Sequence, residues 1–415
     1  MKTAGVLAPF TQRSFRFQWP ADLATSCALE MEMLILGWYV LGATDSVVWL
    51  GVFGASQYLG TLLSPMLGVV GDRVGLRRLL ATMRASYCAF ALCLALLDLA
   101  GALAPLPVFV IAGLSGIVRP SDIGMRNALI GATMPSPLLM GAMGIARMSA
   151  DLARILGALT GAALVAWLGF GTAYLLVAGL YGLSLLLLLG VREPAREVVS
   201  VRPVTSPWRD LGEGIAYVRA TPPLLAGLCL AFLVNFAAFP VTGGLLPFVA
   251  RDVFGMDQAG LGYLSASFAG GALLGSWTLS GVARRLPPAR TVLTAALVWL
   301  PLLAGFARLT DAGAGMAVLA LIGFVQSFCM VPLSVLLLRI AEARFRGRVM
   351  GLRMLAVYGL PLGLLLAGPL IAWAGFLFAV KLYAGLGLLA VLAIAIRFRA
   401  HLLPAGAAAN ATRPS

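Results

Sequence analysis

The stretch Gly68-Val-Val-Gly-Asp-Arg-Val-Gly-Leu-Arg-Arg-Leu79 joins two apolar segments that are each long enough to cross a membrane. These segments run over about 48–69 and 79–99. A connection this short between two spans requires a tight turn. Gly71 and Gly75 permit one, because glycine reaches backbone conformations closed to other residues. The three arginines of the stretch indicate the side of the membrane that retains positive charge.

The composition indicates an integral membrane protein. Of the 415 residues, 61% are hydrophobic and only 11% are charged, so a soluble domain of this make-up would expose too much apolar surface. The formal net charge of +14 could suggest nucleic-acid binding. The arginines, however, are dispersed between apolar segments instead of gathering on one polar face. We therefore expect a lipid bilayer as the partner, and no nucleic acid.

Apolar segments separated by turn signals predict about twelve transmembrane helices, because a helix needs about 20 apolar residues to cross a hydrocarbon core. The segments fall near 22–42, 48–69, 79–99, 105–129, 145–167, 171–191, 222–248, 259–281, 290–308, 313–338, 351–373 and 376–396. When alternate loops are assigned to opposite sides, nearly all the loop arginines fall on one side. This asymmetry places both termini and the central loop in the cytoplasm.

The longest polar connection divides the spans into two groups of six. We expect an N-terminal six-helix bundle over 1–191, a central cytoplasmic linker over 192–221, a C-terminal six-helix bundle over 222–397 and a cytoplasmic tail over 398–415. The residues around Trp167 in the fifth span are repeated around Trp373 in the eleventh, each time with Gly-Phe two residues later. Such repeats are typical of transporters built from two pseudo-symmetric bundles.

The sequence contains no motif typical of an enzyme active site. It contains no nucleophile elbow, no phosphate-binding loop and no metal-binding carboxylate cluster. The five cysteines lie in apolar runs without CxxC spacing, so neither a zinc site nor a disulfide framework is expected. The sequence therefore predicts neither an enzyme nor a cofactor, and the energy for transport would come from an ion gradient or from the gradient of the substrate itself.

Two acidic residues, Glu30 and Glu32, lie near the middle of the first span. An ionised side chain is costly there, so an intramembrane carboxylate is a candidate for binding a proton or a cationic substrate. Residues two positions apart on a helix face roughly opposite directions, so we do not expect both to reach one cavity. The alternative interpretation is a structural carboxylate that is hydrogen-bonded between helices.

The fourth and fifth spans each carry an acidic residue between two arginines, at the three- and four-residue spacings that bring side chains together on a helix. The two groups are Arg119, Asp122 and Arg126, followed by Arg147, Asp151 and Arg154. Mutual neutralisation is the simplest interpretation, and Asp122 is a third candidate for proton coupling. The other interpretation is that one group forms a cytoplasmic latch with the turn stretch, which breaks when the bundles move.

Polar side chains within the other apolar segments are candidates for a central substrate cavity. The candidates are Gln57, Asn235 and Gln326. The alternative is a residue that packs between helices, which is the more common role of such side chains.

The turn stretch resembles the signature loop between the second and third helices of the major facilitator superfamily, whose pattern reads G-x-x-x-D-R-x-G-R-[RK]. The matching residues are Gly68, Asp72, Arg73, Gly75 and Arg77. Leu76 replaces the first basic residue of the closing pair, and the charges continue at Arg77 and Arg78. The resemblance implies that this loop is a cytoplasmic gate, in which the aspartate and the arginines stabilise the outward-facing state by bridging helices.

Further stretches resemble the drug and siderophore exporters of bacteria, a branch that includes enterobactin-exporter-like and macrolide-efflux-like proteins. These stretches are Leu-Gly-Trp-Tyr at 36–39, Glu-Gly at 213–214, Ala-Arg-Asp-Val at 250–253 and Arg-Gly-Arg-Val-Met-Gly-Leu at 346–352. The resemblance implies a monomer in the bacterial inner membrane that exports a small molecule by proton antiport and alternating access. The substrate is either a siderophore or a hydrophobic drug. A transporter-like sensor and a proton-symport importer are further alternatives.

Overall fold

The computed structural model describes residues 7–63, 71, 74–193, 207–282, 286–342 and 345–399. These residues are almost entirely helical and include no strand, which confirms the predicted all-α membrane fold. Nine helical stretches in this part of the chain are long and apolar enough to cross a membrane, or ten if one bent pair counts as a single span. They are α1 (Arg13–Thr44), α4 (Leu76–Leu99), α5 (Pro105–Thr133), α6 (Ser136–Leu168), α7 (Phe170–Leu189), α13 (Pro288–Phe306), α14 (Ala312–Ile340), the stretch Arg346–Ala374 and α17 (Phe376–Arg397).

The remaining predicted spans are shorter, broken or less apolar than the sequence suggested. Of the second, the structure describes α2 (Val47–Ser56) and η2 (Leu59–Leu63), and the rest of its predicted range lies outside the described residues. The seventh is broken into α9 (Pro222–Ala237), α10 (Phe239–Gly243) and α11 (Leu246–Phe248), and α8 (Pro207–Ala220) meets α9 at a bend of 112°. The eighth is α12 (Gln258–Val282), which is rich in glycine and serine. The stretch Arg346–Ala374 consists of α15 (Arg346–Ala356) and α16 (Gly359–Ala374).

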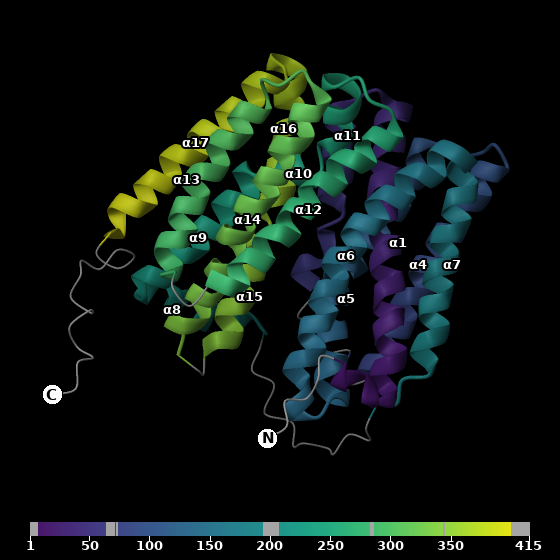
Figure 1. Ribbon diagram of the computed structural model, residues 1–415, viewed down its shortest axis with the longest axis horizontal. Helices are drawn as coiled ribbons and strands as arrows, with labels where there is room; N and C mark the ends of the chain where they lie inside the picture. The colour runs from purple at the N-terminus through teal and green to yellow at the C-terminus, as the bar shows by residue number, and fades with distance from the viewer. Residues whose placement is uncertain are drawn as a thin grey trace. The chain divides into compact units, whose positions relative to one another are not determined.

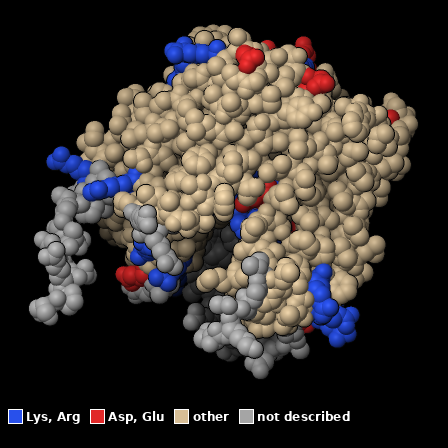
Figure 2. Space-filling model, viewed as in Figure 1, with Lys and Arg blue, Asp and Glu red and all other residues tan. Residues whose placement is uncertain are grey.

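The helices form two compact units. One consists of Met1–Arg202, Gly243–Gly270 and Thr310–Met316, and the other of Pro203–Thr242, Gly271–Leu309 and Ala317–Ser415. The predicted division into 1–191, 192–221, 222–397 and 398–415 stays a prediction. On the face drawn in Figure 2, blue and red side chains are few, and most of the surface belongs to residues other than Lys, Arg, Asp and Glu, drawn tan. That distribution suits helices that present their apolar faces to lipid.

In the first unit, α1 is the central helix and packs against α6 and α7, while α4 packs against α7 (Figure 1). Small residues on α6 allow the close approach to α1. A Cβ atom at Gly157 would lie 2.9 Å from the carbonyl oxygen of Cys27, and one at Gly161 would lie 3.0 Å from Cα of Met31. These glycines therefore permit helix contact by the small-residue packing common in membranes.

A segment from the second half of the chain also belongs to the first unit. Arg251 of η3 (Val249–Val253) donates hydrogen bonds to the carbonyl oxygen of Leu41 at 3.0 Å and to Oδ1 of Asp45 at 2.7 Å. A hydrogen bond to the carboxylate of Asp252 raises the pKa of Arg251 above its ordinary value. The guanidinium thus stays charged, and it caps the last turn of α1.

The second unit has an aromatic core. The ring of Phe236 on α9 stacks on Tyr383 of α17, with centroids 5.4 Å apart, and Trp299 of α13 is fully buried. α9 packs against α16 and α17, and α13 packs against α17.

The described part of the turn stretch at 68–79 is hydrogen-bonded to the residues at the end of α7. Gly75 has a φ of +102°, a conformation that favours glycine, and α4 begins at the next residue. The carboxylate of Glu193 accepts hydrogen bonds from the backbone N–H groups of Leu76 and Arg77, both at 3.2 Å. In return, Arg77 donates to the carbonyl oxygen of Val191 at 3.1 Å. Each helix end thus satisfies the free backbone groups of the other.

The other residues of the predicted gate are only partly described. Arg78 is exposed at the start of α4. Gly68, Asp72 and Arg73 lie outside the described residues, so the predicted latch stays a prediction.

Replacing Glu193 with alanine should lower the free energy of unfolding by about 1 kcal/mol, because the start of α4 loses its side-chain cap. Denaturant unfolding in detergent, followed by tryptophan fluorescence, measures the change. Glu193→Gln is the matched control. It keeps a side-chain oxygen that can accept one of the two bonds, so its loss should be smaller. An alanine variant as stable as the wild type would show that the cap contributes nothing.

Candidate functional site

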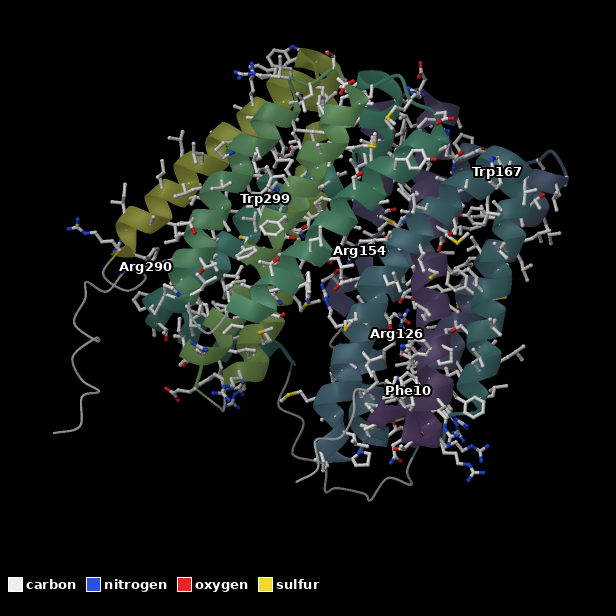
Figure 3. All side chains as sticks on the ribbon, viewed as in Figure 1. Phe10, Arg126, Arg154, Trp167, Arg290 and Trp299 are labelled. Carbon is white, nitrogen blue, oxygen red and sulfur yellow. The ribbon has the colours of Figure 1, made fainter. Side chains whose placement is uncertain are left out.

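A cavity of about 320 Å³ lies within the first unit, between α1, α5 and α6. Phe15 and Trp19 form an aromatic part of its wall. Six charged side chains also line it, namely Asp22, Glu30, Arg119, Arg126, Arg147 and Arg154. In Figure 3, Arg126 lies nearer to Phe10, and Arg154 lies farther along α6 toward Trp167. The cavity can therefore hold an amphipathic molecule, whose apolar part meets the rings and whose polar part meets the charges.

A buried ion-pair cluster forms one side of the cavity. Asp22 of α1 pairs with Arg84 of α4, whose side chain is 0% exposed. Arg126 of α5 pairs with Asp122 one turn earlier, and its Nε lies 3.9 Å from Oδ1 of Asp22. Gln18 adds hydrogen bonds to Oδ2 of Asp22 at 3.2 Å and to the carbonyl oxygen of Arg126 at 3.0 Å. Two carboxylates and two guanidiniums thus neutralise one another where α1, α4 and α5 meet.

A second, more open group of charges lies on α6. The carboxylate of Glu30 lies 3.7 Å from Nε of Arg154, and these side chains are 34% and 37% exposed. Asp151 pairs with Arg147 at 3.1 Å and lies 3.9 Å from Arg154. Because the contact between Glu30 and Arg154 is long and partly open, a charged ligand can compete for either partner.

Arg119 is held differently from the other arginines of the cavity. Its guanidinium donates to Oε1 of Gln57 at 3.0 Å and to the carbonyl oxygen of Leu29 at 2.9 Å. Within the described part of the chain it forms no ion pair with a carboxylate. The amide and the carbonyl fix its position, while its positive charge stays available to the cavity.

Glu32 faces away from the cavity, toward α7. It is only 5% exposed and accepts a hydrogen bond from the hydroxyl of Tyr181 at 2.7 Å. Among the described residues, it forms no ion pair. Glu30 and Glu32 therefore point to different neighbours, as their two-residue spacing on α1 predicts.

The structure brings together some of the predicted site residues and leaves others apart. Glu30, Arg119, Arg126 and Arg154 line one cavity, and Gln57 reaches it through Arg119. The two other amides belong to the second unit. There Asn235 donates to the carbonyl oxygen of Ala231 at 2.8 Å, and Oε1 of Gln326 is buried without a hydrogen-bond partner in the described part of the chain. Their predicted role in a substrate cavity stays a prediction.

Four residues of this region were not predicted from the sequence. Asp22 and Arg84 form a buried pair, Tyr181 binds Glu32, and the ring of Tyr87 lies beside that of Tyr181 with centroids 5.3 Å apart. One signal was available, because Arg84 is a charged residue inside a predicted span and such residues normally have a buried partner. The tyrosines had no such signal, since tyrosine is common in apolar helices.

Comparison with known proteins identifies related transporters. The sequence pattern of the Major Facilitator Superfamily matches residues 23–361. The multidrug efflux pump Tap of Mycolicibacterium fortuitum is 25% identical over 369 residues, which cover 86% of this chain and 88% of Tap. A crystal structure of the nucleoside transporter NupG superposes with a TM-score of 0.74 at 16% identity, covering 92% of this chain and 99% of NupG. A POT family transporter in complex with a peptide conjugate gives a TM-score of 0.72 at 15% identity, covering 94% and 97% of the two chains.

Proposed function

Because the chain belongs to the Major Facilitator Superfamily and is a multi-pass membrane transporter, we propose that it exports a small amphipathic compound in exchange for protons. The proposed location is the inner membrane of a bacterium, with both termini in the cytoplasm. The proposed mechanism is alternating access between two bundles. The cavity of the first unit carries the proposal, because it combines aromatic rings with charged groups inside the membrane-spanning helices.

The proposed direction rests on the multidrug efflux pump Tap, whose sequence aligns along most of this chain. A drug exporter has to accept molecules with an apolar body. Phe15 and Trp19 offer ring faces for such a body, and Glu30 offers a carboxylate for a cationic group.

We assign the proton to Glu32. Glu30 already lies beside Arg154, and Asp122 is paired with Arg126, so each of these carboxylates has a guanidinium as its partner. Glu32 has a tyrosine hydroxyl as its hydrogen-bond partner and is buried. When a buried carboxyl group gains or loses a proton, the change in its charge acts strongly on the neighbouring groups. Coupling of transport to a proton gradient requires such an effect.

The charge of the substrate decides the sense of coupling. A cation bound beside a carboxylate favours its ionised form, so binding releases a proton, and substrate and proton compete as antiport requires. An anion bound at an arginine has the opposite effect and favours protonation of nearby carboxylates. Substrate and proton would then travel together, as in an importer that works by symport. Proton antiport through these groups therefore favours a cationic or zwitterionic substrate.

Siderophore export is the second candidate function. The observation that favours it is the set of four arginines on the cavity wall, of which Arg119 forms no ion pair among the described residues. Guanidinium groups bind carboxylates and other planar anions in two-pronged geometry. A siderophore with anionic groups would meet these arginines.

Transport into liposomes with an imposed pH gradient tests the proposal. The purified protein is reconstituted, and uptake of ethidium, a permanent lipophilic cation, is compared with uptake of enterobactin. For proton antiport we expect accumulation when the lumen is acidic and none when the gradient is reversed. Protein-free liposomes give the passive background. Accumulation only with an acidic exterior would indicate symport, and uptake that ignores the gradient would contradict proton coupling.

A further inference from the structure

Glu32 has no direct contact with the cavity, so it cannot exchange protons directly with the cavity. It is absent from the cavity wall and packs toward α7, where Tyr181 covers it. Asp22, by contrast, lines the cavity, and its side chain is 13% exposed. The two carboxylates are ten residues apart on α1, which is roughly 15 Å along the helix axis. If Glu32 carries the proton, as the proposed function assumes, a set of groups that can relay protons has to cover this distance.

Tyr87 lies in the interval between Asp22 and Glu32. It follows Arg84 by three residues on α4, so it shares the face that pairs with Asp22 of α1. Its ring centroid is 5.3 Å from that of Tyr181, which binds Glu32. The residue is 2% exposed, and its hydroxyl has no hydrogen-bond partner among the described residues. A buried hydroxyl in this situation is normally satisfied by a bridging water.

Asp122 supplies the next group on the side of the cavity. It is fully buried, and one of its oxygens is ion-paired with Arg126 while Oδ1 has no hydrogen-bond partner in the described part of the chain. The hydroxyl of Tyr87 lies within electrostatic range of Asp122 and of Glu32, and also of the cations Arg119 and Arg126. Among the described residues, these four groups and Tyr181 are the charged and titratable groups that act on it from α1, α5 and α7.

We propose that Tyr87 relays protons between Glu32 and the buried ion-pair cluster that contains Asp122 and Asp22, through water that bridges its hydroxyl to both sides. For each proton that passes, the hydroxyl gives its own proton to one neighbour and takes another from the opposite neighbour, so it ends neutral. A hydroxyl suits this role because it is both a donor and an acceptor. Arg119 and Arg126 stay charged throughout and take no proton from the relay. The relay runs on the α4 side of α1, apart from the open part of the cavity.

The Tyr87→Phe variant tests the relay, because it removes only the hydroxyl. Two rates are measured in the reconstituted protein. One is transport driven by a pH gradient, which requires the proton to move. The other is exchange of labelled for unlabelled ethidium at equal pH, which does not. We expect gradient-driven transport to fall by about tenfold, less than the full contribution of a positioned proton-transfer group because water can partly bypass it. Exchange should be unchanged.

Tyr174→Phe is the matched control. Its hydroxyl is also buried without a hydrogen-bond partner among the described residues, and it lies in the electrostatic range of Glu32 and Arg119 but not of Asp122. This variant should transport like the wild type. A Tyr87→Phe protein with wild-type gradient-driven transport would overturn the relay, and so would an equal loss of exchange, which indicates a structural role. If the wild type itself ignores the gradient, the proposed proton antiport fails, and that outcome is distinct from failure of the relay.

Discussion

The Arg84→Leu variant should lose about 3–5 kcal/mol of unfolding free energy, the cost of breaking a buried ion pair by removing one partner. The guanidinium of Arg84 is 0% exposed and pairs with Asp22, and its Nη1 donates to the carbonyl oxygen of Ser184 at 3.4 Å. Leucine would fill much of the space of the arginine side chain. The carboxylate of Asp22 would, however, stay among apolar helices with one guanidinium fewer to compensate its charge. Denaturant unfolding in detergent measures the loss.

Two further variants separate the ion pair from simple packing. In the double variant Arg84→Leu with Asp22→Leu no buried charge is left from this pair, so we expect it to be more stable than Arg84→Leu alone. In Arg209→Leu a guanidinium that is 74% exposed loses its pair with Glu213, and the expected change is below about 1 kcal/mol. If Arg84→Leu changes stability no more than Arg209→Leu, the buried pair does not hold α1 to α4.

The helical fold could be predicted because the bilayer imposes a length and a polarity on each span. The arginine-rich turn at 68–79, the apolar segments and the loop charges each follow from that constraint. Where the prediction deviates, the cause is local. One apolar run contains both Phe239–Gly243 and Leu246–Phe248, yet these are separate helices. Hydropathy alone does not show where the backbone turns within such a run.

The candidate site was only partly predictable, because its contacts join residues far apart in the sequence. Helical spacing predicted that Asp122 pairs with Arg119 and Arg126, and among the described residues only the pair with Arg126 forms. Arg119 turns instead to Gln57, 62 residues away. Tyr181 reaches Glu32 across 149 residues. No periodicity within one helix contains such information, since it depends on which helices become neighbours.

The contacts of the turn stretch at 68–79 were also not predictable from the sequence. The resemblance to the superfamily loop assigned Arg77 a role in bridging helices, and the described contacts are with the backbone at the end of α7. Glu193, which binds the start of α4, is 116 residues from Arg77 and falls in the predicted linker. A sequence pattern can identify the loop, but it does not identify the distant residue that completes the loop.

The Glu32→Gln variant should lose gradient-driven transport by about 100-fold or more, the lower end of what a positioned proton-transfer group contributes to a rate. Glutamine has nearly the same size, and its carbonyl oxygen can accept the hydrogen bond from Tyr181, so the packing of α1 against α7 is retained. What it cannot do is bind and release a proton. Transport driven by a pH gradient should therefore stop, whereas exchange of labelled for unlabelled ethidium at equal pH should continue.

Glu30→Gln is the matched control, because it makes the same chemical change two residues away on the same helix. Glu30 lines the cavity beside Arg154, so its loss should weaken ethidium binding and lower both rates together. The two variants thus separate a carboxylate that binds substrate from one that carries the proton. If the effects are interchanged, the proton belongs to Glu30 and the relay through Tyr87 has no acceptor. If both variants still respond to the gradient, neither carboxylate couples transport to protons.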